Sequence, residues 1–216
     1  MKPILERSNR QLDVPLDAAP RLLLLVAALL LIPTYVLPLW RMTMFAPQYP
    51  DGLRLDIYSY RLEGGNRGQD VKEINILNHY IGMRDLSPTD FTKFKWIPFV
   101  IGVLGLLFLR ALVHGRLGDL LDVVVLYFYF GAFSLWSFGY KLYSYGHDLA
   151  PTASVKVPPF MPPLFGHRKL ANFDVYSFPA AASYALGAVA LALLLALFLG
   201  WREARRAEAA ETRAAG

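Results

Sequence analysis

Four long apolar runs, separated by polar segments, divide the chain. They cover Leu22–Trp40, Trp96–Val113, Val123–Tyr140 and Phe178–Trp201. A helix needs about 20 residues to cross the roughly 30 Å hydrocarbon core of a bilayer. The two middle runs are slightly shorter, but charged side chains near their ends can snorkel to the interface. The pattern predicts an all-α membrane protein with transmembrane helices at 22–40, 96–113, 123–140 and 178–201.

The first long polar segment, residues 41–95, is too long to be a simple connector. Leu53–Leu62 alternates apolar and polar residues, which predicts a half-buried strand ended by the turn residues 63–66. Val71–Ile81 has the apolar spacing of a short helix, with a strand as the alternative. Ser87–Asp90 is typical of a helix N-cap followed by proline. Together these elements predict a small α+β cap.

The second polar segment, residues 141–177, is rich in proline. Five prolines between residues 151 and 163 exclude regular helix there. Val157–Gly166 is therefore expected to be extended and stiff. Its apolar side chains are expected to lie on the cap or against a partner protein.

The distribution of Lys and Arg predicts the orientation in the membrane. Taken together, the segments 1–21, 110–119 and 202–216 are denser in basic residues than the two long segments, and the short turn between the second and third runs covers 114–122. Both termini are therefore expected in the cytoplasm, with residues 41–95 and 141–177 outside. The first run has acidic residues in its leader and no small-residue cleavage site, so it is expected to be a retained helix.

Composition excludes several kinds of chemistry. The chain has no cysteine, so disulfides, thiolate metal sites and cysteine-ligated iron–sulfur clusters are excluded. The one histidine on the helical side, His114, lies in the short inner turn, so no haem is expected. The net charge of +5 comes with no basic stripe between aromatics, and nucleic-acid binding is not expected. No nucleotide-binding or hydrolase motif occurs, so no catalytic residue is predicted.

Apart from Met1, all methionines lie in the two outer segments, as do three of the four histidines. Thioether and imidazole groups together suit copper, with sulfur favouring Cu(I). Methionine is also a common packing residue, and copper–methionine motifs usually repeat, which these do not. Packing is therefore the favoured interpretation and a copper site the alternative. The candidate copper ligands are Met42, Met44, His79, Met83, His147 and His167.

The third apolar run is dense in aromatic residues between Tyr127 and Tyr140. Such a surface is able to hold a quinone. Packing within the bundle and an aromatic belt at the interface explain most of the pattern without a ligand. A quinone site is therefore kept only as an alternative.

Two stretches resemble a known family. One is Met44–Leu53 followed by Ile74–Met83, and the other runs from Tyr145–Leu149 through Pro158–Gly166 to Ala171–Phe173. They resemble the small polytopic (NosB-like) membrane proteins encoded beside nitrous oxide reductase in the second clade of its operons. The similarity covers most of residues 20–178. It implies a periplasm-facing accessory protein for a copper enzyme, and it carries over no ligand residue.

These observations lead to one favoured function and two alternatives. The favoured function is a non-catalytic, multi-pass inner-membrane partner of a periplasmic copper reductase, without a cofactor of its own. A copper-handling maturation factor and a quinol-facing electron-transfer subunit are the alternatives. The sequence indicates no oligomeric state. The predicted partner contacts are Asn75, Asn78, Tyr80, Phe160, Leu164 and Phe165.

Overall fold

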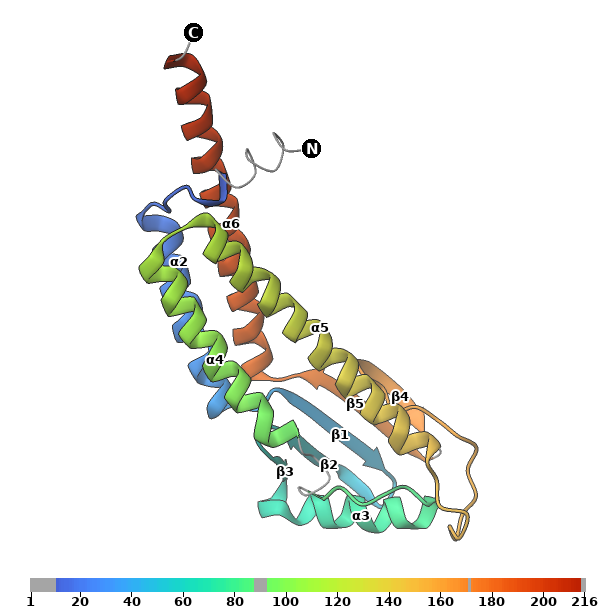
Figure 1. Ribbon diagram of the computed structural model, residues 1–216. Coiled ribbons are helices and arrows are strands. Elements are labelled where there is room, and N and C mark those ends of the chain that lie inside the picture. Colours follow the sequence, from blue (N-terminus) through green and yellow to red (C-terminus); the bar gives the residue numbers. More distant parts are fainter. Residues whose placement is uncertain (1–10, 88–92, 171, 215–216) are drawn as a thin grey trace. The chain divides into compact units, whose positions relative to one another are not determined.

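The computed structural model describes residues 11–87, 93–170 and 172–214 (Figure 1). Within this part of the chain, four helical stretches are long and apolar enough to cross a membrane. They are Ala18–Tyr35, Trp96–His114, Leu117–His147 and Ala181–Ala210. The prediction of a mostly helical chain with four such helices and a small sheet-containing unit is confirmed.

The chain forms two compact units. The helical unit comprises Met1–Ile32, Phe99–Gly131 and Ala185–Gly216, and the sheet unit comprises Pro33–Pro98 and Ala132–Tyr184. Helices α5 (Leu117–His147) and α6 (Ala181–Ala214) each contribute residues to both units.

The helical unit is built from α2 (Ala18–Leu30), most of α4 (Lys93–His114), the first half of α5 and most of α6. The hydroxyl of Tyr127 in α5 donates a 2.6 Å hydrogen bond to the carbonyl of Leu186 in α6. Fully buried side chains from all four helices form the core of this unit, among them Leu24, Leu104, Phe108, Leu120, Val189 and Leu193.

A tight turn joins α4 to α5. Gly115 has a φ of +62°, a conformation that favours glycine, and a Cβ there would overlap the Arg21 guanidinium. The Leu16 N–H donates to the Gly115 carbonyl at 2.7 Å, and the Leu117 N–H donates to the Val14 carbonyl at 3.1 Å. The segment before α2 is therefore held against this turn.

The sheet unit contains a five-stranded antiparallel sheet in the order β3-β2-β1-β5-β4 (Figure 1). Its central pair, β1 and β5, joins residues far apart in sequence, with Trp40 opposite Pro179 and Met44 opposite Val175. The strands are β1 (Trp40–Ala46), β2 (Tyr49–Ile57), β3 (Leu62–Gly64), β4 (Gly166–Leu170) and β5 (Phe173–Pro179).

One face of the sheet holds the core of this unit. Met42, Leu53, Leu55 and Val175 pack there against Ile74 of α3 (Gln69–Ile81). Leu142 of α5 packs against the same cluster. Alternate strand residues point to opposite faces of a sheet, so this packing fixes which positions of each strand lie on the other face.

Helix α3 ends in a Schellman motif. The N–H of Gly82 bonds to the His79 carbonyl, and the N–H of Met83 bonds to the Asn78 carbonyl at 2.8 Å. Gly82 has a φ of +78°, as this motif requires. The predicted short helix at 71–81 is confirmed, and the strand alternative is wrong.

The proline-rich segment contains no helix over residues 151–165, as predicted, and it packs on its own unit. Pro162 and Pro163 are buried. The Phe160 N–H donates to the carbonyl of Gly146 in α5 at 3.0 Å, and the Ser177 hydroxyl of β5 donates to the Leu164 carbonyl at 3.1 Å. Much of this segment therefore belongs to the sheet unit itself.

Several predicted boundaries need correction. The predicted strand at 53–62 is two strands, because the chain turns at Tyr58–Arg61, where the Tyr58 N–H bonds to the Arg61 carbonyl. The first apolar run ends in a strand, because Trp40 is the first residue of β1. The fourth apolar run begins in a strand, because Phe178 lies in β5. The third helix extends over Leu117–His147. The N-cap predicted at 87–90 lies largely outside the described residues.

Candidate functional site

The two methionines of β1 are core residues. Met42 is buried in the hydrophobic cluster under the sheet, and Met44 packs against that cluster two residues along the strand. Met83 lies elsewhere, in the loop that follows α3. Packing therefore accounts for the positions of Met42 and Met44.

The three histidines of the outer segments lie on three different elements. His79 is exposed on α3. His147 ends α5, stacks on Tyr143 and makes a 2.9 Å hydrogen bond with the Tyr143 carbonyl. His167 of β4 pairs with Asp174 at 2.9 Å. Among the described residues, no three His, Cys, Asp or Glu side chains form a group able to hold a metal ion.

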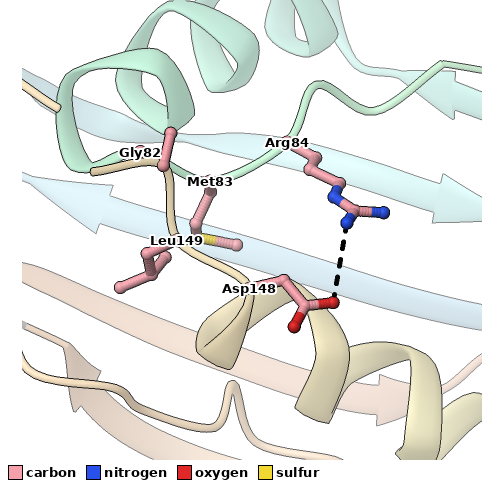
Figure 2. A pocket seen from close by; sticks show the side chains of 6 residues that line it. Gly82, Met83, Arg84, Asp148 and Leu149 are labelled. Atoms are coloured by element: carbon pink, nitrogen blue, oxygen red, sulfur yellow. Dashed lines mark ion pairs between the residues drawn. The ribbon is translucent and has the colours of Figure 1, made fainter. Parts of the chain in front are cut away.

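A surface pocket lies where the loops after α3 and α5 meet (Figure 2). Figure 2 shows Arg84 reaching towards Asp148, and the two charged groups are 3.7 Å apart. Gly82, Met83, Leu149 and Ala150 complete the lining. The Ala150 N–H donates to the Gly82 carbonyl at 2.8 Å, so a backbone hydrogen bond joins the two loops. The pocket lies between the two loops, and Met83 supplies the one thioether among its lining residues.

The predicted partner residues on α3 divide into two groups. The side-chain oxygen of Asn75 accepts the Leu86 N–H at 2.7 Å, and the side-chain amide of buried Asn78 donates to the Arg84 carbonyl at 3.4 Å. These two amides therefore hold the loop after α3. Tyr80 is exposed and lies beside another exposed apolar residue, since its carbonyl accepts the Val155 N–H at 2.9 Å.

The predicted partner residues of the proline-rich segment also differ in exposure. Phe160 and Leu164 are half-buried, whereas Phe165 is 66% exposed. The ring of Phe165 packs edge-to-face on Phe178 of β5 at 5.3 Å. Phe178 is opposite Arg41 in the register, so it points away from the core face that α3 covers. The structure therefore places Tyr80 and Phe165 on opposite faces of the sheet unit.

Within the sheet unit, α3 and α5 pack on the core face of the sheet, and most side chains of the second face are exposed. We call this second face the uncovered face, and define it by Arg41, Thr43 and Phe45 of β1 with their register partners on the other strands. These partners are Arg54 and Asp56 of β2, Glu63 of β3, Asp174, Tyr176 and Phe178 of β5, and His167 and Lys169 of β4.

An aromatic stripe crosses the β5 side of the uncovered face. The ring of Phe45 contacts Tyr176 at 5.7 Å between centroids, and the Tyr176 ring contacts His167 at 4.5 Å. Phe45 also lies over Gly52, where a Cβ would approach its ring to 2.7 Å. Phe45, Tyr176 and Phe178 remain between 36% and 42% exposed.

A buried carboxylate lies on the β2 side of the same face. Asp56 is 4% exposed, although it points away from the core, because two arginines cover it. The Nε of Arg41 donates to Asp56 at 2.7 Å, and the Nε of Arg54 donates to it at 2.8 Å. Both arginine side chains are about half exposed. Burial alone would raise the pKa of the Asp56 carboxyl, but the hydrogen bonds from Arg41 and Arg54 outweigh it and hold that pKa below its usual range.

This lowered pKa predicts a pH-dependent contribution to stability. A carboxyl whose pKa is lower in the folded state stabilises that state above its unfolded pKa, about 3.9, and less as the pH falls through the folded value. We expect the melting midpoint of the wild type to exceed that of Asp56→Asn at about pH 6. The difference should shrink towards about pH 3. A difference that stays constant with pH would show that the carboxylate charge is not responsible.

Sequence reasoning missed the residues of the uncovered face. Trp40–Met44 alternates apolar and polar residues, which is the pattern of a half-buried strand, and this was the available signal for β1. Phe173–Pro179 has no such alternation, because Ser177 is buried whereas Tyr176 and Phe178 are exposed. Each segment also adjoins a long apolar run.

Three aromatic residues of the third run illustrate how its side chains lie. Tyr127 is buried and hydrogen-bonded to the Leu186 backbone. Trp136 and Tyr140 are exposed and stack on each other with centroids 5.9 Å apart. Exposed aromatic pairs of this kind are typical of an interfacial belt.

Comparisons of the chain with protein-family models, with curated proteins and with solved structures find no match.

Proposed function

We propose that this protein is a non-catalytic integral membrane partner that holds a soluble extracytoplasmic protein at the membrane. The observation that carries the proposal is the sheet unit. It has its own buried core and a half-exposed aromatic face, and its two sequence segments are inserted between helices long enough to span a bilayer. A folded unit with exposed aromatic and arginine side chains has the composition of a protein interface.

The resemblance described above suggests the partner: a periplasmic copper-containing reductase of the nitrous oxide type. All the segments that carry it, between Met44 and Phe173, fall within the residue ranges of the sheet unit. In this proposal the protein resides in the cytoplasmic membrane, and its sheet unit faces the periplasm.

Removal of the protein tests the proposal. In cells that lack it, the reductase is expected to move from the membrane fraction to the soluble periplasmic fraction, as quantified by mass spectrometry. A tagged form of the chain should restore membrane association and copurify the reductase from solubilised native membranes. A tagged multi-pass protein of unrelated sequence serves as the control. An unchanged distribution of the reductase would overturn the proposal.

The orientation gives a separate prediction. Both termini are expected in the cytoplasm because basic residues are dense near them. A reporter fused after Gly216 should be active only in its cytoplasmic form. A reporter inserted beside Arg67, an exposed turn residue of the sheet unit, should be active only in its periplasmic form. The reverse pattern would place the sheet unit in the cytoplasm, where a periplasmic protein is out of reach.

Phe165 and Phe160 are expected to respond differently to substitution. Phe165 is 66% exposed, so Phe165→Ser should leave the melting midpoint nearly unchanged. It should weaken copurification of the reductase by about tenfold or more, because burying a phenylalanine is worth about 1.5–3 kcal/mol. Phe160 is half-buried, and Phe160→Ser should lower the midpoint instead. Normal copurification by Phe165→Ser would exclude Phe165 from the interface.

A further inference from the structure

We propose that the uncovered face of the sheet binds a carboxylate-bearing surface of a soluble partner protein, with Arg41 as the carboxylate contact. The aromatic stripe of Phe45, Tyr176 and Phe178 supplies the adjoining apolar contact. This inference rests on the proposed function and deepens it, because it assigns the docking surface and the chemistry of the partner.

Arg41 and Arg54, the two arginines that bind Asp56, supply the charge of the proposed docking surface. Arg41 uses only its Nε for Asp56, and its terminal nitrogens make no hydrogen bond to the described residues. Arg54 gives Asp56 both its Nε and one terminal nitrogen. Asp56 thus neutralises one of the two guanidinium charges and fixes the orientation of both groups. Arg41 is left with a free, partly exposed pair of donors, and such a pair matches a carboxylate in bidentate geometry.

The aromatic stripe supplies the apolar part of the proposed docking surface. Phe178 of β5 is directly opposite Arg41 of β1, so the stripe begins on the neighbouring strand. Tyr176 lies two residues before Phe178 on β5, opposite Thr43. The Tyr176 ring contacts the Phe45 ring within the stripe and the His167 ring beside it. Tyrosine, phenylalanine and arginine are the residues enriched in protein interfaces. Contacts within the stripe already hold the rings, so little conformational freedom is lost on binding.

The mixture of charges favours a protein over a lipid surface. Anionic lipid surfaces attract clusters of Lys and Arg. The uncovered face instead presents Glu63 and Asp174 beside its cations, with Asp174 paired to His167 and Glu63 to Arg61 at 2.8 Å. Fixed charges of both signs around an aromatic centre suit a partner with a defined complementary pattern.

Site-specific photo-crosslinking in native membranes tests the inference on the full chain. Tyr176, on the uncovered face, is replaced by p-benzoylphenylalanine. Tyr80, an exposed tyrosine on α3, is replaced in the matched control. We expect an adduct with a soluble protein from position 176 and none from position 80. Mass spectrometry should map the crosslinked peptide to a surface that carries Asp or Glu.

The charge contact is tested in the same assay. Arg41→Gln should reduce the adduct at position 176 by about tenfold or more, the range expected for a hydrogen bond to a charged group. Arg54 still pairs with Asp56 in this variant, so the melting midpoint should fall less than in Asp56→Ala, which serves as the comparison for stability. Raising the salt concentration should reduce the adduct without any substitution, because exposed charges are screened.

The outcomes separate this inference from the proposed function. An Arg41-dependent adduct with the reductase supports both. The same adduct with a different, identified acidic protein supports the docking surface and overturns the reductase as partner. The inference is overturned if no adduct forms, or if the adduct contains only lipid or a second copy of this chain. It is also overturned if neither Arg41→Gln nor added salt changes the yield of the adduct. The reductase distribution in cells without the protein then decides the proposed function separately.

Discussion

Gly146→Ala is expected to destabilise the sheet unit, although alanine is normally the better helix former. Gly146 lies near the end of α5, and a Cβ there would overlap the carbonyl oxygen of Phe160. The Gly146 carbonyl also accepts the Phe160 N–H, so the proline-rich segment crosses the helix in direct backbone contact. Overpacking of this kind costs about 1–3 kcal/mol. We expect the melting midpoint in detergent to fall by several degrees.

Gly131→Ala is the matched control in the same helix. No described atom lies within 4 Å of a Cβ at this position, so only helix propensity changes. Alanine should gain about 0.5–1 kcal/mol over glycine there, and the midpoint should stay the same or rise. Limited proteolysis should cut the proline-rich segment faster in Gly146→Ala alone. Equal midpoints for the two variants would show that this segment does not rest on α5.

Asp56→Ala is the second substitution with a large expected effect. It leaves the guanidinium groups of Arg41 and Arg54 side by side without their shared carboxylate. Hydrogen bonds to charged groups are worth about 1.5–3 kcal/mol, and the two arginines recover part of that from water because they are half exposed. A loss of about 2 kcal/mol is therefore expected, measured as a fall in the melting midpoint of the full chain.

Glu63→Ala provides the comparison on the same face. Glu63 and Arg61 form an ion pair at 2.8 Å in which both side chains are nearly half exposed. Exposed pairs of this kind contribute about 0–1 kcal/mol. The midpoint of Glu63→Ala should lie close to that of the wild type. Similar falls in both variants would mean that the burial of Asp56 adds nothing to its contribution.

The four long helices were predictable because a run of apolar residues is a local signal. So was α3, where the spacing of Ile74 and Leu77 shows the covered face of the helix. The prolines between 151 and 163 exclude regular helix whatever surrounds them. In each case the sequence near the element contains the physical cause of its conformation.

The candidate site was less accessible to prediction. Phe165 and Tyr80 were predicted as partner contacts, and both are exposed. The sequence did not indicate that they lie on opposite faces of the sheet unit. That separation follows from the register of β1 with β5, which places Phe178, and Phe165 on it, beside Arg41.

The sequence by itself determined where the apolar helices lie, where α3 forms and where helix is excluded, because each depends on residues close together in the chain. Only the tertiary structure decided which strands pair in the sheet and which side chains share its uncovered face. The central pairing joins Trp40 to Pro179, and no local pattern specifies a partner at such a separation. The same pairing brings Phe178 opposite Arg41, while the β1–β2 pairing brings Arg41 over Asp56. A polar strand residue becomes a buried carboxylate only when its neighbours on adjoining strands cover it.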